Sequence, residues 1–293
     1  MEDLPVEIQT AVMSLLPLKE AVRASIVSTS WSTLWTLHVN LCFIGPNDPD
    51  FEDDMDYITD DQYIDDLVKI ERAKFIDSVN GIIQRHSGIG INKFSIRCAL
   101  GLPKEDLGHL HRWIAFAASS KASIIEFDLK KMHWASKEAV HHFPLEALDV
   151  QGNSCLQSLF LADVSIKLHF GICGFGILRR LVLDHVQIFG DFPGLFDCPG
   201  LANLSVPHKL DKLQHLLIEG RDVEMIEFHA ANLGHFEYKL GRVIPIVLHG
   251  CSKLEKATIL FICDKGLGNA FTLVPSILPV KILNVEAVII RYE

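Results

Sequence analysis

The sequence predicts an α/β chain in which a short helical module precedes an irregular solenoid of stacked strands. Three observations support this fold class: the amino-terminal residues carry apolar side chains at helical spacing, an acidic segment follows them, and the remainder repeats a short apolar pattern typical of strands. We therefore expect a helical module at 1–43, an acidic linker at 44–63, a connecting helix at 64–90 and a repeat domain at 91–293.

The helical module should contain three short helices. Ile8, Val12, Leu15 and Leu16 recur at i, i+4, i+7 and i+8, and Pro17 should end that helix. Two further stripes follow, one at Leu18, Val22 and Ile26 and the other at Val27, Trp31, Leu34 and Trp35. The last stripe places both tryptophans on one helical face.

The segment that follows is dense in aspartate and contains Pro46 and Pro49, so we expect a solvated linker. The alternating carboxylates from Asp50 to Asp56 do not form a calcium loop, because the central glycine and closing glutamate of an EF-hand are missing. Apolar residues at helical spacing then predict the connecting helix, which Gly88 and Gly90 should close.

The rest of the chain repeats the apolar pattern Φ-x-x-Φ-x-Φ, in which Φ is an apolar residue. The strings are Ile91/Phe94/Ile96, Ile124/Phe127/Leu129, Leu145/Leu148/Val150, Leu156/Leu159/Leu161, Leu178/Leu181/Leu183, Leu201/Leu204/Val206, Leu213/Leu216/Ile218, Val223/Ile226/Phe228, Leu233/Phe236/Tyr238, Leu254/Ala257/Ile259 and Val280/Leu283/Val285. The steps from Leu156 to Leu178 to Leu201 are 22 and 23 residues, which is typical of leucine-rich repeats. Other steps are only 10 to 12 residues, so some strings are either the return side of a coil or chance matches. A helical pattern at 107–117 lies between the first two strings, which favours strand–helix–strand coils there.

Composition narrows the classes of function. A net charge of −10 argues against nucleic-acid binding, which requires clustered Lys and Arg. The 7 cysteines are widely spaced and include no C-x-x-C pair, which favours thiols in a reducing compartment. The amino terminus lacks signal-peptide features, and no stretch approaches the roughly 18 apolar residues that span a bilayer. We expect a cytoplasmic and/or nuclear protein with no membrane partner.

The sequence contains no recognisable catalytic or metal-binding motif. The closest histidine groupings, His109-x-His111 and His141-His142, lack the H-E-x-x-H pattern of a zinc protease. Glycine clusters do not match phosphate-binding loops, and no G-x-S-x-G elbow occurs. We therefore expect no catalytic residue, no cofactor and no metal ligand. A hydrolase or transferase would need a constellation of groups that the sequence does not display.

The amino-terminal motifs resemble a known family. Leu4-Pro5-x-Glu7-Ile8, Leu15-Leu16-Pro17-Leu18 through Arg23, and Trp31-x-x-Leu34-Trp35 are similar to the F-box. The resemblance is to the FBD-type family of plant F-box proteins that carry leucine-rich repeats. It continues through Phe75–Val79, Ile91–Ile96 and Ile125–Leu129, and loosely through Leu254–Ala257.

The resemblance implies a non-catalytic subunit of a ubiquitin ligase. In that family the F-box packs against a Skp-family adaptor, which links to cullin and RING subunits, and the repeats hold a protein substrate on a curved surface. The residues that would divide between the F-box core and the adaptor-facing surface are Leu4, Pro5, Ile8, Leu15, Leu16, Leu18, Val22, Val27, Trp31, Leu34 and Trp35. The sequence leaves that division open, with the two tryptophans favoured as anchors. Exposed residues between the repeat core positions, such as Gln157, Ser158, Arg179, Arg180, Gln214 and His215, would carry recognition.

The sequence departs from the family in two places. Ser30 and Ser32 replace basic residues that flank the first tryptophan in many relatives. The string at Val280–Val285 comes just before Glu293, where relatives continue into further repeats and an FBD-type segment, so we expect an array without a polar carboxy-terminal cap. The alternative function is a stand-alone or degenerate leucine-rich-repeat scaffold without ligase function.

Overall fold

A computed structural model describes residues 5–27, 31–45, 61–98, 106–129, 141–148, 155–168, 175–190, 202–205, 210–220, 223–241, 244–263 and 280–289. The chain divides into two compact units, Met1–Glu138 and Ala139–Glu293. Leu4 and residues 46–60 of the expected acidic linker lie outside the described residues.

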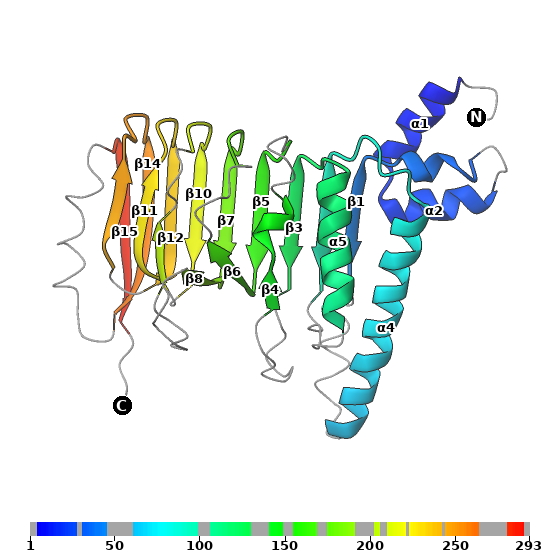
Figure 1. Ribbon diagram of the computed structural model, residues 1–293, viewed down its shortest axis with the longest axis horizontal. Coiled ribbons are helices and arrows are strands. Elements are labelled where there is room, and N and C mark those ends of the chain that lie inside the picture. The colour runs from blue at the N-terminus through cyan, green and yellow to red at the C-terminus, as the bar shows by residue number, and fades with distance from the viewer. Residues whose placement is uncertain are drawn as a thin grey trace. The chain divides into compact units, whose positions relative to one another are not determined.

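The first unit begins with the predicted helices. Helix α1 spans Val6–Leu15 and α2 spans Leu18–Val27. Pro17 separates them as expected, and the preceding Leu16 adopts an extended backbone with ψ of 149°. The third predicted helix is a short 3-10 turn, η1, at Leu34–Leu37. These elements form the helical module at the blue end of the chain (Figure 1).

The same unit contains a small parallel sheet flanked by two helices (Figure 1). Strands β1 (Asn40–Ile44), β2 (Lys93–Arg97) and β3 (Ile124–Asp128) pair in that order. Helix α4 (Asp61–Arg85) connects β1 to β2, and α5 (Leu107–Ser119) connects β2 to β3. Gly88 and Gly90 follow α4 with φ of +71° each, a conformation that glycine adopts without strain. Strand β1 was not predicted, whereas α5 and the two later strands were.

The main sheet of the second unit confirms the repeat pattern. Its strands are β5 (Ser158–Ala162), β7 (Arg180–Asp184), β10 (His215–Glu219), β12 (His235–Gly241), β14 (Lys256–Cys263) and β15 (Ile282–Ile289). Each pairs with the next in parallel (Figure 1). The middle apolar residue of each string lies in one register row: Leu159, Leu181, Leu216, Phe236, Ala257 and Leu283. Stacked repeats thus form a continuous core, as in a leucine-rich-repeat solenoid.

Two smaller parallel sheets lie on the return side of the coils. One contains β4 (His141–Phe143), β6 (Val164–Leu168) and β8 (Gln187–Gly190). The other contains β9 (Ala202–Ser205), β11 (Val223–His229) and β13 (Ile246–His249).

The return strands correct two predictions about the repeats. Residues 202–205 of one string form β9 and the string at 223–228 lies in β11, so the 23-residue step between the strings that begin at Leu178 and Leu201 does not join neighbours in the main sheet. The strand after β7 in that sheet is β10, because the coil between them is long enough to include β8 and β9. The string beginning at Leu145 is a 3-10 turn, η3 (Leu145–Leu148), and not a strand.

Candidate docking surface and repeat face

The helical module buries a small core. Met13 of α1, Ala21 of α2, and Leu34 and Trp35 of η1 form one apolar cluster. Trp35 is only 7% exposed, so its large indole ring fills the space between the three elements. A few half-buried side chains pack around this cluster: Leu16, Val22, Ala24 and Trp31, together with Ile82 of α4.

The opposite face of α1 is apolar and exposed. Ile8 and Leu15 lie seven positions apart on one side of the helix and are 49% and 84% exposed, with the half-buried Val12 between them. At the end of α2, Ile26 is 83% exposed. The stripe that the sequence predicts along α1 is therefore its outward face, whereas Gln9 and Met13 are buried. We call Ile8, Val12 and Leu15 of α1 the apolar face of the module.

The structure gives the burial of each residue predicted for the F-box core or the adaptor-facing surface. The predicted residues that it exposes are Pro5, Ile8 and Leu15; those that it half-buries are Leu16, Val22 and Trp31; those that it buries are Leu18, Leu34 and Trp35. Leu4 and the side chain of Val27 lie outside the described residues. Trp35 is thus a core residue. The indole N–H of Trp31 is buried without a hydrogen-bond partner among the described atoms.

Two buried histidines connect the helical module to the rest of the first unit by hydrogen bonds. The Nε2 atom of His38 lies 2.9 Å from the carbonyl oxygen of Leu16, and the Nε2 atom of His86 lies 2.9 Å from the carbonyl oxygen of His38. The Nδ1 atom of His86 accepts the N–H of Gly88, and that of His38 accepts the N–H of Asn40. This network assigns a neutral ring with the proton on Nε2 to both residues. Burial lowers the pKa of His86, which is consistent with a neutral ring.

The outward face of the main sheet presents side chains in register rows. One row consists of Ser158, Arg180, His215, His235, Lys256 and Ile282. A second row, four residues further along each strand, consists of Ala162, Asp184, Glu219, Lys239, Leu260 and Glu286, of which Ala162 and Asp184 are buried. The first row is mainly basic and the second carries three carboxylates, so the face changes charge along its strands. Of the residues predicted to be exposed, Gln157, Arg179, Arg180 and Gln214 are exposed, and Ser158 and His215 are half-buried.

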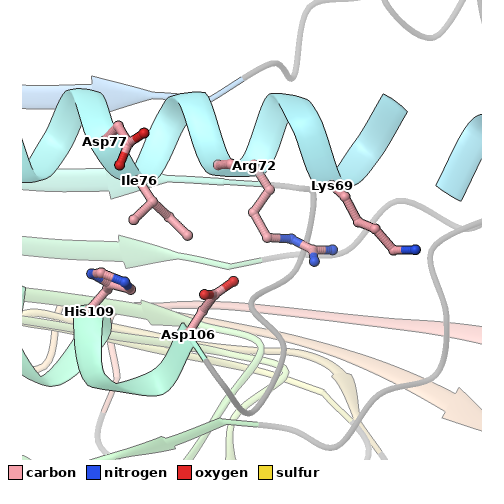
Figure 2. Close-up of a pocket in the computed structure, with 7 residues that line it drawn as sticks. Lys69, Arg72, Ile76, Asp77, Asp106 and His109 are labelled. Carbon is pink, nitrogen blue, oxygen red and sulfur yellow. The ribbon is translucent and has the colours of Figure 1, made fainter. Parts of the chain in front are cut away.

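A shallow hollow lies between α4 and α5. Figure 2 shows Lys69, Arg72 and Ile76 projecting from α4 on the side where Asp106 and His109 lie. The hollow has a volume of about 300 Å³. Its lining includes two cations and the carboxylates of Asp77 and Asp106, so it favours no single ligand charge.

The fold also gathers potential metal ligands that the sequence did not indicate. Glu227, His229 and His249 bring one ligand atom each to within 4.8 Å of one another, and so do Asp184, His185 and Glu219. In each group the residues come from two neighbouring strands about 20 residues or more apart in sequence, so only the strand register reveals them. The sequence does not contain the register that brings these residues together, which is that of the main-sheet strands β7 and β10 in one group and of the return strands β11 and β13 in the other.

A helical module followed by parallel strands on both sides of a repeating coil defines the class of the protein, a leucine-rich-repeat protein with an amino-terminal F-box. The F-box domain model matches residues 1–43, and the model of the At1g61320/AtMIF1 LRR domain matches residues 82–292. The chain belongs to this plant F-box/LRR-repeat family. Proteins of the family are typically non-catalytic adaptors.

Individual relatives come from Arabidopsis thaliana. The chain is 30% identical to F-box/LRR-repeat protein At3g58940 over 112 residues, which is 38% of this chain and 16% of that protein. It is 25% identical to the putative F-box/FBD/LRR-repeat protein At1g66290 over 263 residues, 87% of this chain and 48% of that protein. The chain thus spans about half the length of the second relative and less of the first. No solved structure matches it. Among the described residues, no helix is long and apolar enough to cross a membrane.

Proposed function

We propose that this chain is a substrate-recognition subunit of a cullin–RING ubiquitin ligase. In this proposal the helical module binds a Skp-family adaptor, and through it the cullin and RING subunits. The repeat unit binds a protein substrate, and the partner subunits carry the transfer chemistry. The observation that supports the proposal is the apolar face of the module. It is exposed on helix α1, whose other side packs into a core through Met13.

The apolar face has the chemistry of a protein interface. Isoleucine and leucine side chains that are half or more exposed gain free energy when a partner covers them, at about 25 cal/mol for each Å² of apolar surface. Ile8 and Leu15 project from one side of α1, so one partner surface could cover both. The family match at 1–43 supports a Skp-family adaptor as that partner.

The main-sheet face supports the recruitment half of the proposal. Its rows place Arg180, His235 and Lys256 at the start of the strands and Glu219 and Glu286 four residues further along. Charges arranged in this way select partners by complementarity and by repulsion of mismatched surfaces. A folded protein or an extended peptide with the opposite charge order would fit this face.

A binding measurement tests the docking half. The full chain is titrated with a purified plant Skp-family adaptor, and the titration is repeated with the double substitution Ile8→Ser and Leu15→Ser. Both side chains are exposed, so the helices should still form, and we expect the affinity to fall by tenfold or more, as is typical of apolar anchors.

The matched control is Ile89→Ser, because Ile89 is 74% exposed but lies outside the module, after α4. This variant should bind the adaptor as tightly as the unsubstituted chain. Absence of binding by the unsubstituted chain would refute the proposal and favour the stand-alone scaffold. Equal binding by the double variant would place the contact elsewhere on the module.

A further inference from the structure

We propose that Glu227, His229 and His249 form a binding site for a divalent transition-metal ion, with Zn²⁺ as the representative ligand. The site lies on the outward face of the return-side sheet that contains β9, β11 and β13. It is independent of the docking function proposed for the helical module.

Strand geometry places the three side chains together. Glu227 and His229 are two positions apart on β11, so they point to the same face, while the intervening Phe228 is fully buried in the core. His249 of β13 pairs directly with His229 in the parallel register. Neighbouring strands hold paired residues roughly 5 Å apart, so the backbone fixes all three positions before any ligand arrives.

The distances between the side chains suit a single ion. The Nε2 atom of His249 lies 2.9 Å from Oε1 of Glu227, and the rings of His229 and His249 stack with centroids 4.3 Å apart at an interplanar angle of 15°. A ligand atom from each residue lies within 4.8 Å of the other two. Tetrahedral zinc with bonds of about 2.0–2.1 Å separates its ligand atoms by roughly 3.3 Å, so small side-chain rotations would complete the geometry.

The ligand chemistry selects the class of metal. Two imidazoles and one carboxylate suit Zn²⁺, Cu²⁺ or Ni²⁺ better than Ca²⁺ or Mg²⁺, which prefer oxygen ligands. In the metal-free protein a hydrogen bond joins Nε2 of His249 to the carboxylate of Glu227. An ion bound between these two atoms would replace that hydrogen bond, and both imidazoles would bind it in the neutral form. Three protein ligands leave a further position on the ion open to water.

A similar arrangement on the main sheet provides a natural comparison. His215 and His235 pair in register on β10 and β12, and Glu237 lies two positions after His235. There the ring centroids are 6.4 Å apart, and Lys239 forms an ion pair with Glu237. The lysine charge opposes a cation at that position, so these residues should not hold a metal.

The test is a titration of the full chain with Zn²⁺ after removal of bound metal by a chelator. Calorimetry measures the affinity and stoichiometry for the unsubstituted chain, His229→Ala, His249→Ala and the control His235→Ala. Replacing a residue that only orients a metal ligand typically lowers metal affinity by about 10–100-fold. Loss of a direct ligand should therefore remove one bound equivalent of Zn²⁺ or lower the affinity of the site by at least about tenfold. Thermal unfolding provides a second readout, since an ion bound only by the folded state raises the Tm.

The expected result is that the unsubstituted chain and His235→Ala bind Zn²⁺ alike and gain Tm, whereas His229→Ala and His249→Ala lose both effects. Equal binding by all four proteins would overturn the site, because the ion would then bind elsewhere on the chain. Failure of the unsubstituted chain to bind Zn²⁺ would also overturn it. Circular dichroism of the metal-free proteins checks that each variant is folded, since all three histidines are at least partly exposed.

Discussion

Leu15 and Leu34 show why residue type alone does not reveal a role in the module. Both are leucines in short helical elements with apolar neighbours at helical spacing, yet Leu15 is 84% exposed and Leu34 is 6% exposed. The difference arises because η1 packs against the Met13 side of α1 and leaves the Ile8–Leu15 side uncovered. The apolar spacing of the sequence does not encode which side of α1 the later helical element covers.

His86 should make the stability of the first unit depend on pH. Burial lowers the pKa of His86 in the folded state below the unfolded value of about 6.5, so the unfolded state binds the extra proton more readily. Folded-state stability should therefore fall as the pH drops from about 6.5 toward the lowered pKa and then level off. The substitution His86→Gln retains a side-chain N–H that can donate to the carbonyl oxygen of His38. It removes the ionisable imidazole.

The measurement is the Tm of both proteins between about pH 7.5 and 5.5. At neutral pH the variant should be less stable, because it lacks the Nδ1 acceptor for the N–H of Gly88. The difference in Tm between the two proteins should shrink on acidification. A difference that stays constant with pH would contradict a buried neutral His86.

The apolar pattern predicted where strands occur more reliably than it predicted which sheet each strand joins. It marked every main-sheet strand of the second unit as well as β2 and β3. It gave the same signal for β9 and β11, because a strand on either side of a coil turns apolar residues inward. Short return strands such as β4 (His141–Phe143) and β13 (Ile246–His249) escaped it, since three or four residues hold too few apolar positions for the pattern.

A half-buried amide, that of Asn80, connects α4 to α5. The Oδ1 atom of Asn80 accepts the indole N–H of Trp113 at 3.0 Å, and its Nδ2 atom lies 2.9 Å from Nδ1 of His109. Trp113 is fully buried, and its ring packs edge-on against Phe75 of α4. Asn80→Ala would leave the indole N–H buried without its partner, which typically costs about 1–3 kcal/mol.

Urea unfolding followed by tryptophan fluorescence measures this cost. Lys74→Ala on the exposed side of α4 is the control, and it should change the unfolding free energy by less than about 0.5 kcal/mol because its ion pair with Glu71 is solvent-exposed. Equal effects of the two substitutions would show that the amide contributes no more than a surface contact.

For the whole molecule, sequence reasoning predicted the modules better than the sites. The F-box motif located the helical module, because its prolines, leucines and tryptophans have characteristic spacing. The proposed metal ligands were missed, because Glu227 and His249 are distant in sequence and become neighbours only through the pairing of β11 with β13. Register between return strands depends on the length of each coil, and the coils are irregular.

Both units contain buried apolar side chains. We expect damage to the core of one unit to affect mainly that unit. Phe236 is fully buried in the middle of the main sheet, between Leu216 and Ala257 in its register row. Phe236→Ala should destabilise the repeat unit by about 3–5 kcal/mol, because the removed ring leaves a cavity in a packed core. In a repeat array that loss spreads to neighbouring coils, since each coil is stabilised by contact with the next.

Hydrogen exchange measured by mass spectrometry distinguishes the two units. We expect Phe236→Ala to lower amide protection across 210–263 while peptides from 5–45 and 61–98 keep theirs, and adaptor binding should be unchanged. Leu15→Ala is the control and should alter protection in neither unit, because Leu15 is exposed. Equal loss of protection in both units would mean that they unfold as one cooperative body, and the helical module would then depend on the repeats for its stability.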